Sequence, residues 1–180
     1  MSQTFRSHRM FDEGGQILGR LVERPLAELQ AQGGVLIRGA YAGVNYKDAL
    51  TGLNRAKIMR RFPLNVGIEH TGTVVASDDP RFALGDAVIA HGFGMGAERD
   101  GGFAEMIAMP AELVVKLPPG LSLREAGILG VAGYTAAVAI DALEHNGLAP
   151  ANGPVAVNGA TGGVASIAID MLSSAGYDVH

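Results

Sequence analysis

The stretch from Val155 to His180, VAVNGATGGVASIAIDMLSSAGYDVH, constrains the fold of this chain more than any other segment. A short apolar run at residues 155–158 breaks into glycines, and a helix-patterned segment follows at residues 164–175. Gly176 is expected to cap that helix, and Tyr177 begins another apolar run. This order predicts a βαβ unit, the building block of a doubly wound (Rossmann) α/β domain. Such a sheet needs more strands than these, so the predicted domain is truncated.

The glycine-rich turn suggests a chemistry as well as a fold. In a dinucleotide-binding βαβ unit, the first amides of the helix face the pyrophosphate, and a Cβ atom there would block the phosphate. We therefore expect the cofactor to contact the turn and the helix start, at Thr161, Gly162, Gly163 and Val164. Ala165 is small enough for close packing between helix and strand. A plain tight turn is the alternative, because such turns also use glycine for backbone reasons.

The sequence leaves the identity of the nicotinamide cofactor open. The residue that reads the ribose 2′ position lies about 20 residues beyond the glycine turn. It therefore falls at or past His180. NADPH is the preferred expectation, and NADH is the alternative.

The first part of the chain is β-rich, and the pattern changes after Pro119. Ser122 and Glu125 form the signature of a capping box, which predicts a helix start, and a second helix is expected at residues 134–145. We therefore predict a β-rich domain over residues 1–121 and the beginning of a nucleotide-binding domain over residues 122–180. The alternating and apolar runs predict strands at residues 5–10, 16–22, 35–42, 70–76, 87–90, 103–109 and 114–117.

Composition narrows the classes of function. A net charge of −4 and a pI near 5.7 argue against a nucleic-acid partner, and the lack of cysteine excludes disulfides and thiolate metal sites. The apolar runs are interrupted before about 20 residues, so no membrane partner is expected, and without a secretory signal the expected location is cytoplasmic. The basic run Arg55, Lys57, Arg60 and Arg61 is either a solvated face or a phosphate-binding element.

Several motifs occur together in one order: NYKDAL, FPLNVGIEHTGTV, DPRFALGDAVI, AGYTAAVAIDALEHNGL and VNGATGGVAS. Taken jointly they resemble the medium-chain dehydrogenase/reductase superfamily, in particular its zinc-free quinone oxidoreductase-like branch and the acryloyl-CoA reductase group. The resemblance implies a GroES-like β-rich catalytic domain followed by a Rossmann domain. It covers the N-terminal half of such an enzyme.

The resemblance also bears on metal chemistry. Zinc-dependent relatives place ligands where Asn45, Ile68 and the region of Ala132 stand here, and none of these side chains binds zinc well. No metal site is therefore expected. Hydride transfer without zinc suits a substrate that conjugation already activates. The expected reaction is NAD(P)H-dependent reduction of a short 2-enoyl-CoA such as acryloyl-CoA, with a quinone or enone oxidoreductase, or an inactive binding or structural fragment, as alternatives.

The resemblance supplies the catalytic candidates. Tyr46 is expected to contact the nicotinamide and to act as a donor or proton relay, and Asn45 to donate its amide to substrate or cofactor. Thr135 matches a threonine that lies near the nicotinamide in the family. Structural alternatives remain: Tyr46 could pack at a strand-to-helix junction, and Asp48 is expected to act as a helix cap or loop anchor. A small-molecule substrate is the expected partner, with a homo-oligomer in the full-length protein.

Overall fold

A computed structural model describes residues 3–30 and 32–180 of the chain. The chain divides into two compact units, Met1–Ile128 and Leu129–His180, each with its own fold. The division rests on contacts, so the domain boundary predicted at residues 121/122 stays a prediction. In chain order the strands are β1 (Thr4–Glu13), β2 (Gln16–Pro25), β3 (Val35–Tyr41), β4 (Leu64–Asn65), β5 (Glu69–Ser77), β6 (Ala87–His91), β7 (Met106–Met109) and β8 (Val114–Lys116). The helices are α1 (Ala27–Gln30), α2 (Tyr46–Gly52), α3 (Leu123–His145) and α4 (Gly163–Ser174), with short 3₁₀ turns at Ala111–Leu113 and Pro150–Asn152.

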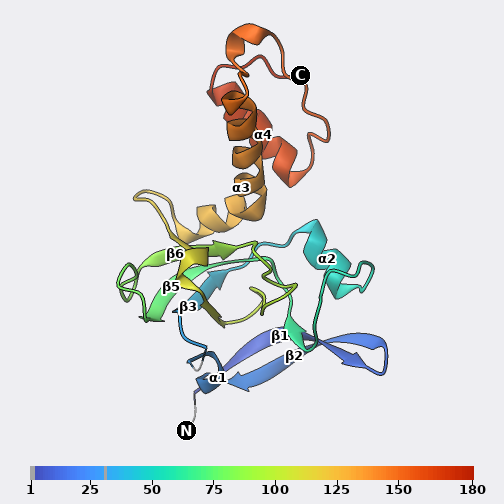
Figure 1. Ribbon diagram of the computed structural model, residues 1–180, viewed down its shortest axis with the longest axis vertical. Coiled ribbons are helices and arrows are strands. Elements are labelled where there is room, and N and C mark those ends of the chain that lie inside the picture. Colours follow the sequence, from blue (N-terminus) through green and yellow to red (C-terminus); the bar gives the residue numbers. More distant parts are fainter. Residues whose placement is uncertain (1–2, 31) are drawn as a thin grey trace. The chain divides into compact units, whose positions relative to one another are not determined.

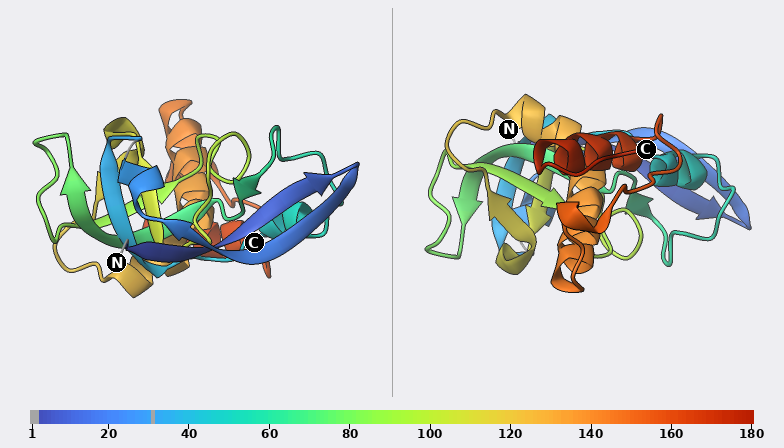
Figure 2. Two further views of the ribbon diagram at one scale, coloured as in Figure 1. Left: turned by 90° about the horizontal axis from the view of Figure 1, so that it is seen from below. Right: turned by 90° about the horizontal axis from the view of Figure 1, so that it is seen from above.

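The first unit contains two antiparallel sheets. The smaller has the strand order β2-β1-β4, and β1 and β2 form the long hairpin drawn in blue in Figure 1. Gly14 and Gly15 form its turn with φ values of 67° and 92°, a conformation that two-residue hairpin turns require. Figure 2 shows the hairpin as a twisted ribbon, as expected for a two-stranded segment.

The larger sheet has the order β7-β3-β5-β6-β8 and carries the main core. Apolar side chains from its strands and from neighbouring loops pack into one cluster, which stabilises the unit by removing apolar surface from water. The buried members are Val35, Ile37, Val74, Phe82, Val88, Ala90, Met95, Ile107, Met109 and Val114.

The strands predicted from the sequence are present, with one clear difference in extent. A strand was expected to start at Phe103, but β7 starts at Met106. The preceding residues bond elsewhere: the Phe103 amide donates to the Val66 carbonyl (2.9 Å), and the Phe103 carbonyl accepts from His8 (2.8 Å). These long-range contacts hold Phe103 and Ala104 against β1 and the loop before β5, outside the ladder between β3 and β7.

The predicted helix start at Ser122 is confirmed. The Ser122 amide donates to Glu125 Oε2 (2.9 Å), and the Glu125 amide donates to Ser122 Oγ (3.2 Å), which is a reciprocal capping box. The two helices expected after Ser122 form one element, α3, which is interrupted at Gly130 by a non-helical backbone with φ 45° and ψ −145°.

Among the described residues, α3 is the helix that is long and apolar enough to cross a membrane by length and composition. Its most apolar window of 18 residues has a mean hydropathy of 1.6. One helix of this kind is weak evidence for a span, and Gly130 breaks its helical backbone. The expectation of no membrane partner therefore stays a prediction.

The second unit contains the predicted βαβ pattern in short form. The strand expected at residues 155–158 reduces to a parallel bridge between Val155 and Val179. Around it, the Val157 amide donates to the His180 carbonyl (2.8 Å), and the His180 amide donates to the Val155 carbonyl (2.9 Å). Helix α4 connects the two segments, and its Leu172 packs with Ile140 and Tyr177 in a small buried cluster. Gly176 follows α4 with φ 89°, as expected for a helix cap.

Candidate functional site

The glycine turn before α4 has the backbone that a phosphate-binding turn needs. Gly159 lies directly after the segment that bridges to Val179, and its φ is 72°, in the left-handed region that favours glycine. The Gly162 amide donates to the Gly159 carbonyl at 2.8 Å, which closes the turn. Gly162 is then extended (φ −82°, ψ 153°) as the N-cap, and α4 begins at Gly163.

The surface of this turn is open. Thr161, Gly162, Gly163 and Val164 are all exposed, and no side chain caps the N-terminus of α4 within the described part of the chain. The first amides of a helix lack intrahelical acceptors and carry the positive end of its dipole. A Cβ atom at Gly162 would lie 3.2 Å from the Gly159 carbonyl oxygen, so a side chain would crowd the turn. The four predicted residues therefore form one exposed surface with donors suited to an anionic group.

Sequence reasoning missed Gly159. It gave weight to Gly162, Gly163 and Ala165 and left the residue that makes the sharp turn out of the site. The signal was available, because a glycine directly after a buried strand is the position that a dinucleotide-binding turn uses for its tightest bend. Its positive φ is the observation that identifies this role.

Thr135 lies in α3, four residues after Val131, and not at a helix start. Its hydroxyl donates to the Val131 carbonyl at 2.7 Å, so its proton is engaged within the helix. The exposed hydroxyl oxygen still has acceptor capacity. Within the same unit, a Cβ atom at Gly163 would be in ordinary contact with Ala132 (3.5 Å), so the start of α4 packs beside α3 close to Thr135.

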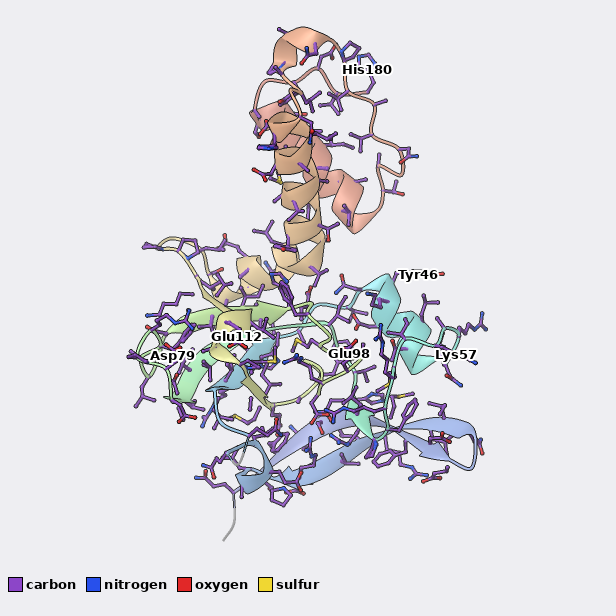
Figure 3. All side chains as sticks on the ribbon, viewed as in Figure 1. Tyr46, Lys57, Asp79, Glu98, Glu112 and His180 are labelled. Carbon is purple, nitrogen blue, oxygen red and sulfur yellow. The ribbon has the colours of Figure 1, made fainter. Side chains whose placement is uncertain are left out.

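The two catalytic candidates lie together at the start of α2, in the first unit. Tyr46 is the first residue of α2, and its side chain is 80% exposed, which leaves the hydroxyl free to reach a ligand (Figure 3). Asn45 is the N-cap, and its amide nitrogen Nδ2 is buried with no hydrogen-bond partner among the described residues. A donor role for Asn45 toward a substrate therefore stays a prediction.

Asp48 anchors this helix start, although Asn45 and not Asp48 is the N-cap. The Asn45 amide donates to Asp48 Oδ2 at 2.8 Å, so Asp48 is the third helical residue of a capping box. Asp48 is 4% exposed, and burial raises the pKa of its carboxyl, with the nearby Glu69 charge adding to the effect. This buried carboxyl fixes the backbone that presents Tyr46.

Two histidines lie on neighbouring strands of the larger sheet, His70 on β5 and His91 on β6. The pKa of His70 is lowered by burial, although its hydrogen bond with Gly102 opposes the shift. His70 Nδ1 lies 2.9 Å from the Gly102 carbonyl oxygen and therefore carries the proton of the neutral ring. Burial also lowers the pKa of His91, opposed by the charge of Glu69. His70 is 1% exposed, and its Nε2 is buried without a hydrogen-bond partner among the described residues.

The positions where the resemblance implies zinc ligands in zinc-dependent relatives are Asn45, Ile68 and the region of Ala132. Ile68 is 8% exposed and apolar. Across residues 3–30 and 32–180, no three His, Cys, Asp or Glu side chains are grouped so as to hold a metal ion. The donor set at these positions does not fit zinc.

Comparison with known proteins identifies the family. Residues 31–119 match the alcohol dehydrogenase GroES-like domain. YhfP of Bacillus subtilis, named a quinone oxidoreductase, is 53% identical over 146 residues, which are 81% of this chain and 44% of YhfP. The acrylyl-CoA reductase AcuI of Ruegeria pomeroyi is 39% identical over 168 residues, which are 93% of this chain and 51% of AcuI. The chain thus spans about half the length of the curated relatives it matches.

Solved structures of related oxidoreductases are also similar to this chain. The yhdH oxidoreductase of Salmonella enterica in complex with NADP superposes with a TM-score of 0.91 at 40% identity, over 97% of this chain and 53% of that one. Bacillus subtilis yhfP with NAD bound has a TM-score of 0.91 at 45% identity, over 99% and 54% of the two chains. The match confirms the predicted fold class, a GroES-like domain followed by the start of a Rossmann domain. The chain belongs to the medium-chain dehydrogenase/reductase superfamily.

Proposed function

We propose that this chain is part of an NAD(P)H-dependent oxidoreductase that reduces a conjugated carbonyl without zinc, with a short 2-enoyl-CoA such as acryloyl-CoA as substrate. The observation that carries the proposal is the exposed turn from Gly159 to Gly163, which opens the N-terminus of α4 without a side-chain cap. NADP and NAD occur with the related yhdH and yhfP structures, respectively. A cytoplasmic enzyme, oligomeric at full length, is part of the same proposal.

The residues of the turn fit a dinucleotide. The amides of Gly163 and Val164 would bind the pyrophosphate, because they are exposed at the positive end of α4. Gly162 leaves room for the phosphate oxygens, and Thr161 offers a hydroxyl beside them. On α3, Thr135 can only accept a hydrogen bond while its proton is held by Val131. The Thr135 hydroxyl oxygen would therefore accept a hydrogen bond from the NH₂ group of a carboxamide.

When bound, a reduced nicotinamide supplies a hydride to the β-carbon of the substrate. Negative charge then develops on the thioester or ketone oxygen, which requires hydrogen-bond donors held in place beforehand. Tyr46 is our candidate for this donor, because its hydroxyl is exposed and its backbone is fixed by the Asn45–Asp48 capping box. Asn45 would contribute its amide only if its buried Nδ2 turned outward.

Reduction of a quinone or enone is the second candidate, and the 53% identity with YhfP favours it. The two candidates share the cofactor and the hydride step and differ in the acceptor. A binding or structural role without catalysis is the third candidate for the 180-residue chain itself, because the chain spans only about half of its relatives.

The test is a comparison of turnover by the protein at the length of its relatives. We expect kcat/KM with NADPH to be higher for acryloyl-CoA than for a benzoquinone. The reverse order would replace the enoyl-CoA proposal with the quinone alternative. The same assay with NADH in place of NADPH decides the cofactor preference. No turnover of either acceptor with either cofactor would contradict the oxidoreductase proposal.

Tyr46→Phe tests the donor role directly. We expect about 10²-fold lower kcat, because the substitution removes the hydroxyl and keeps the ring. Tyr41→Phe is the matched control, since Tyr41 is also exposed but lies outside the candidate site. Equal kcat for Tyr46→Phe and the unmodified enzyme would remove Tyr46 from the mechanism.

A further inference from the structure

A large cavity in the first unit lies outside the candidate site. Its volume is about 840 Å³, and its lining includes four arginines: Arg9, Arg24, Arg61 and Arg99. Arginine side chains concentrate in a cavity where a planar guanidinium can pair with carboxylate or phosphate oxygens.

Two of the arginines are already paired. Arg9 Nη1 donates to Asp100 Oδ1 (2.9 Å), and Arg24 Nη1 donates to Asp100 Oδ2 (2.9 Å). Arg24 also pairs with Glu28 at 2.8 Å. Two guanidinium groups therefore meet two carboxylates, and this part of the wall is electrically balanced.

The other two arginines have no ion-pair partner among the residues that the structure describes. Arg61 is exposed. The Arg99 side chain is half-buried, and its Nε is buried without a hydrogen-bond partner. This Nε is closed to solvent, so a ligand would contact the Nη atoms of Arg99, which also have no hydrogen-bond partner within the described residues.

Backbone contacts bring these two arginines to the same end of the cavity. The Arg60 amide donates to the Ala97 carbonyl (2.9 Å), which joins the segment that carries Arg61 to the segment that carries Arg99. Further along the two segments, the Asn65 amide donates to Asp100 Oδ1 (3.0 Å). Arg9 Nη2 donates to the Pro63 carbonyl between them (2.9 Å). Residues 60–65 and 97–100 therefore form one wall.

The carboxylates in the lining belong mainly to other segments. Asp78 Oδ2 accepts the Gly34 amide (3.0 Å), and Asp79 pairs with Arg81 (2.8 Å). Glu112 is the remaining acidic side chain of the lining. Neither Asp78 nor Asp79 is paired with Arg61 or Arg99, which leaves two positive charges uncompensated at the wall formed by residues 60–65 and 97–100.

We propose that Arg61 and Arg99 form a binding site for a phosphate group in this cavity. A phosphate offers several acceptor oxygens, so it can take charge-assisted hydrogen bonds from both guanidinium groups at once. The cavity volume exceeds what one phosphate fills, which fits a phosphate ester of a larger organic molecule. The basic run at residues 55–61 supplies Arg61, so one end of that run has a binding role and the remainder forms a solvated face. This proposal does not depend on the proposed reaction.

The test is calorimetric titration of the 180-residue chain at low ionic strength with inorganic phosphate, and separately with coenzyme A. We expect Arg61→Gln and Arg99→Gln each to weaken phosphate binding about tenfold, as loss of a charge-assisted hydrogen bond predicts. Arg55→Gln is the control, because it removes the same charge at an exposed residue that lies outside the cavity. The affinity of the Arg55→Gln variant for phosphate should stay within about twofold of that of the unmodified chain.

Two outcomes overturn the proposal: no binding of either probe, or equal losses in Arg55→Gln and Arg61→Gln. The two probes distinguish the sources of the phosphate. Tighter binding of coenzyme A with the same dependence on Arg61 indicates an ester of that kind, and equal affinity indicates a site for free phosphate. Arg61 is exposed, so Arg61→Gln should fold normally and keeps the test decisive if Arg99→Gln does not fold.

Discussion

Asp100 is the residue whose removal should destabilise the first unit most clearly without creating a cavity. It accepts hydrogen bonds from Arg9, Arg24 and the Asn65 amide, and thereby joins β1, β2 and the segment before β5. Asp100→Asn keeps the shape of the side chain and removes its charge. One oxygen becomes an NH₂ group, which places a donor against the donor of one arginine.

The magnitude follows from the burial of the three side chains, which are only 14%, 12% and 18% exposed for Arg9, Arg24 and Asp100. Removing one partner of a buried ion pair destabilises by about 3–5 kcal/mol, because the remaining charges lose their compensation. Residual exposure favours the lower end, about 3 kcal/mol. For a unit of 128 residues, this loss corresponds to a fall in Tm of about 10 °C.

The assay is urea and thermal unfolding of the 180-residue chain followed by circular dichroism at pH 7. Glu13→Gln is the matched control, because Glu13 pairs with Arg20 on an exposed surface and its loss should hardly change Tm. An unfolding free energy for Asp100→Asn within about 0.5 kcal/mol of the unmodified chain would refute the reasoning.

The difference in unfolding free energy between Asp100→Asn and the unmodified chain should also depend on pH. Burial alone would raise the pKa of Asp100, but hydrogen bonds from Asn65 and Arg24 and the charges of Arg9 and Arg24 hold it below its usual range. The carboxylate therefore stabilises the folded state fully above the pKa of the unfolded chain. That contribution is lost as the pH falls through the folded-state pKa, so the gap between Asp100→Asn and the unmodified chain should narrow below about pH 4.

Two further predictions concern the histidines of β5 and β6 and one glycine. Burial lowers the pKa values of His70 and His91, so below about pH 6.5 the unfolded chain binds protons that the folded chain does not. The unfolding free energy, measured by urea unfolding, should therefore fall between about pH 6.5 and 5. An unfolding free energy that stays constant over this range would contradict the prediction. Gly102→Ala should destabilise the chain by more than about 2 kcal/mol in the same assay, because the new Cβ would lie 1.9 Å from the Glu69 carbonyl oxygen. Gly52→Ala is the control and should not destabilise, because a Cβ at Gly52 meets nothing within 4 Å. Equal stability of the two variants would contradict the close approach at Gly102.

Features set by neighbouring residues could be predicted from the sequence. The Ser122–Glu125 capping box is local in sequence, and the structure forms it as expected. The glycine turn and helix α4 follow the same logic, because strand, turn and helix lie within one short segment. Family resemblance added the GroES-like domain, whose β-rich pattern alone would have fitted other folds.

Features that depend on contacts between distant residues could not be predicted. Strand β7 starts at Met106, and not at Phe103 as predicted, because Phe103 bonds to His8 and Val66, which lie far away in the sequence. The phosphate-site proposal depends on the same kind of information. The sequence showed Arg61 in a basic run, but its partner Arg99 reaches the same wall only through tertiary contacts.

The most direct test of the central claim, that the open N-terminus of α4 binds the pyrophosphate of a nicotinamide cofactor, is a ¹⁵N NMR titration of the 180-residue chain with NADPH. This method detects weak binding, so it suits a chain that spans half of its relatives. We predict that the largest amide shifts fall at Gly159, Gly162, Gly163 and Val164, and that Gly162→Val removes them. Saturating NADPH that leaves these four amides unmoved, or shifts that survive Gly162→Val, would contradict the account.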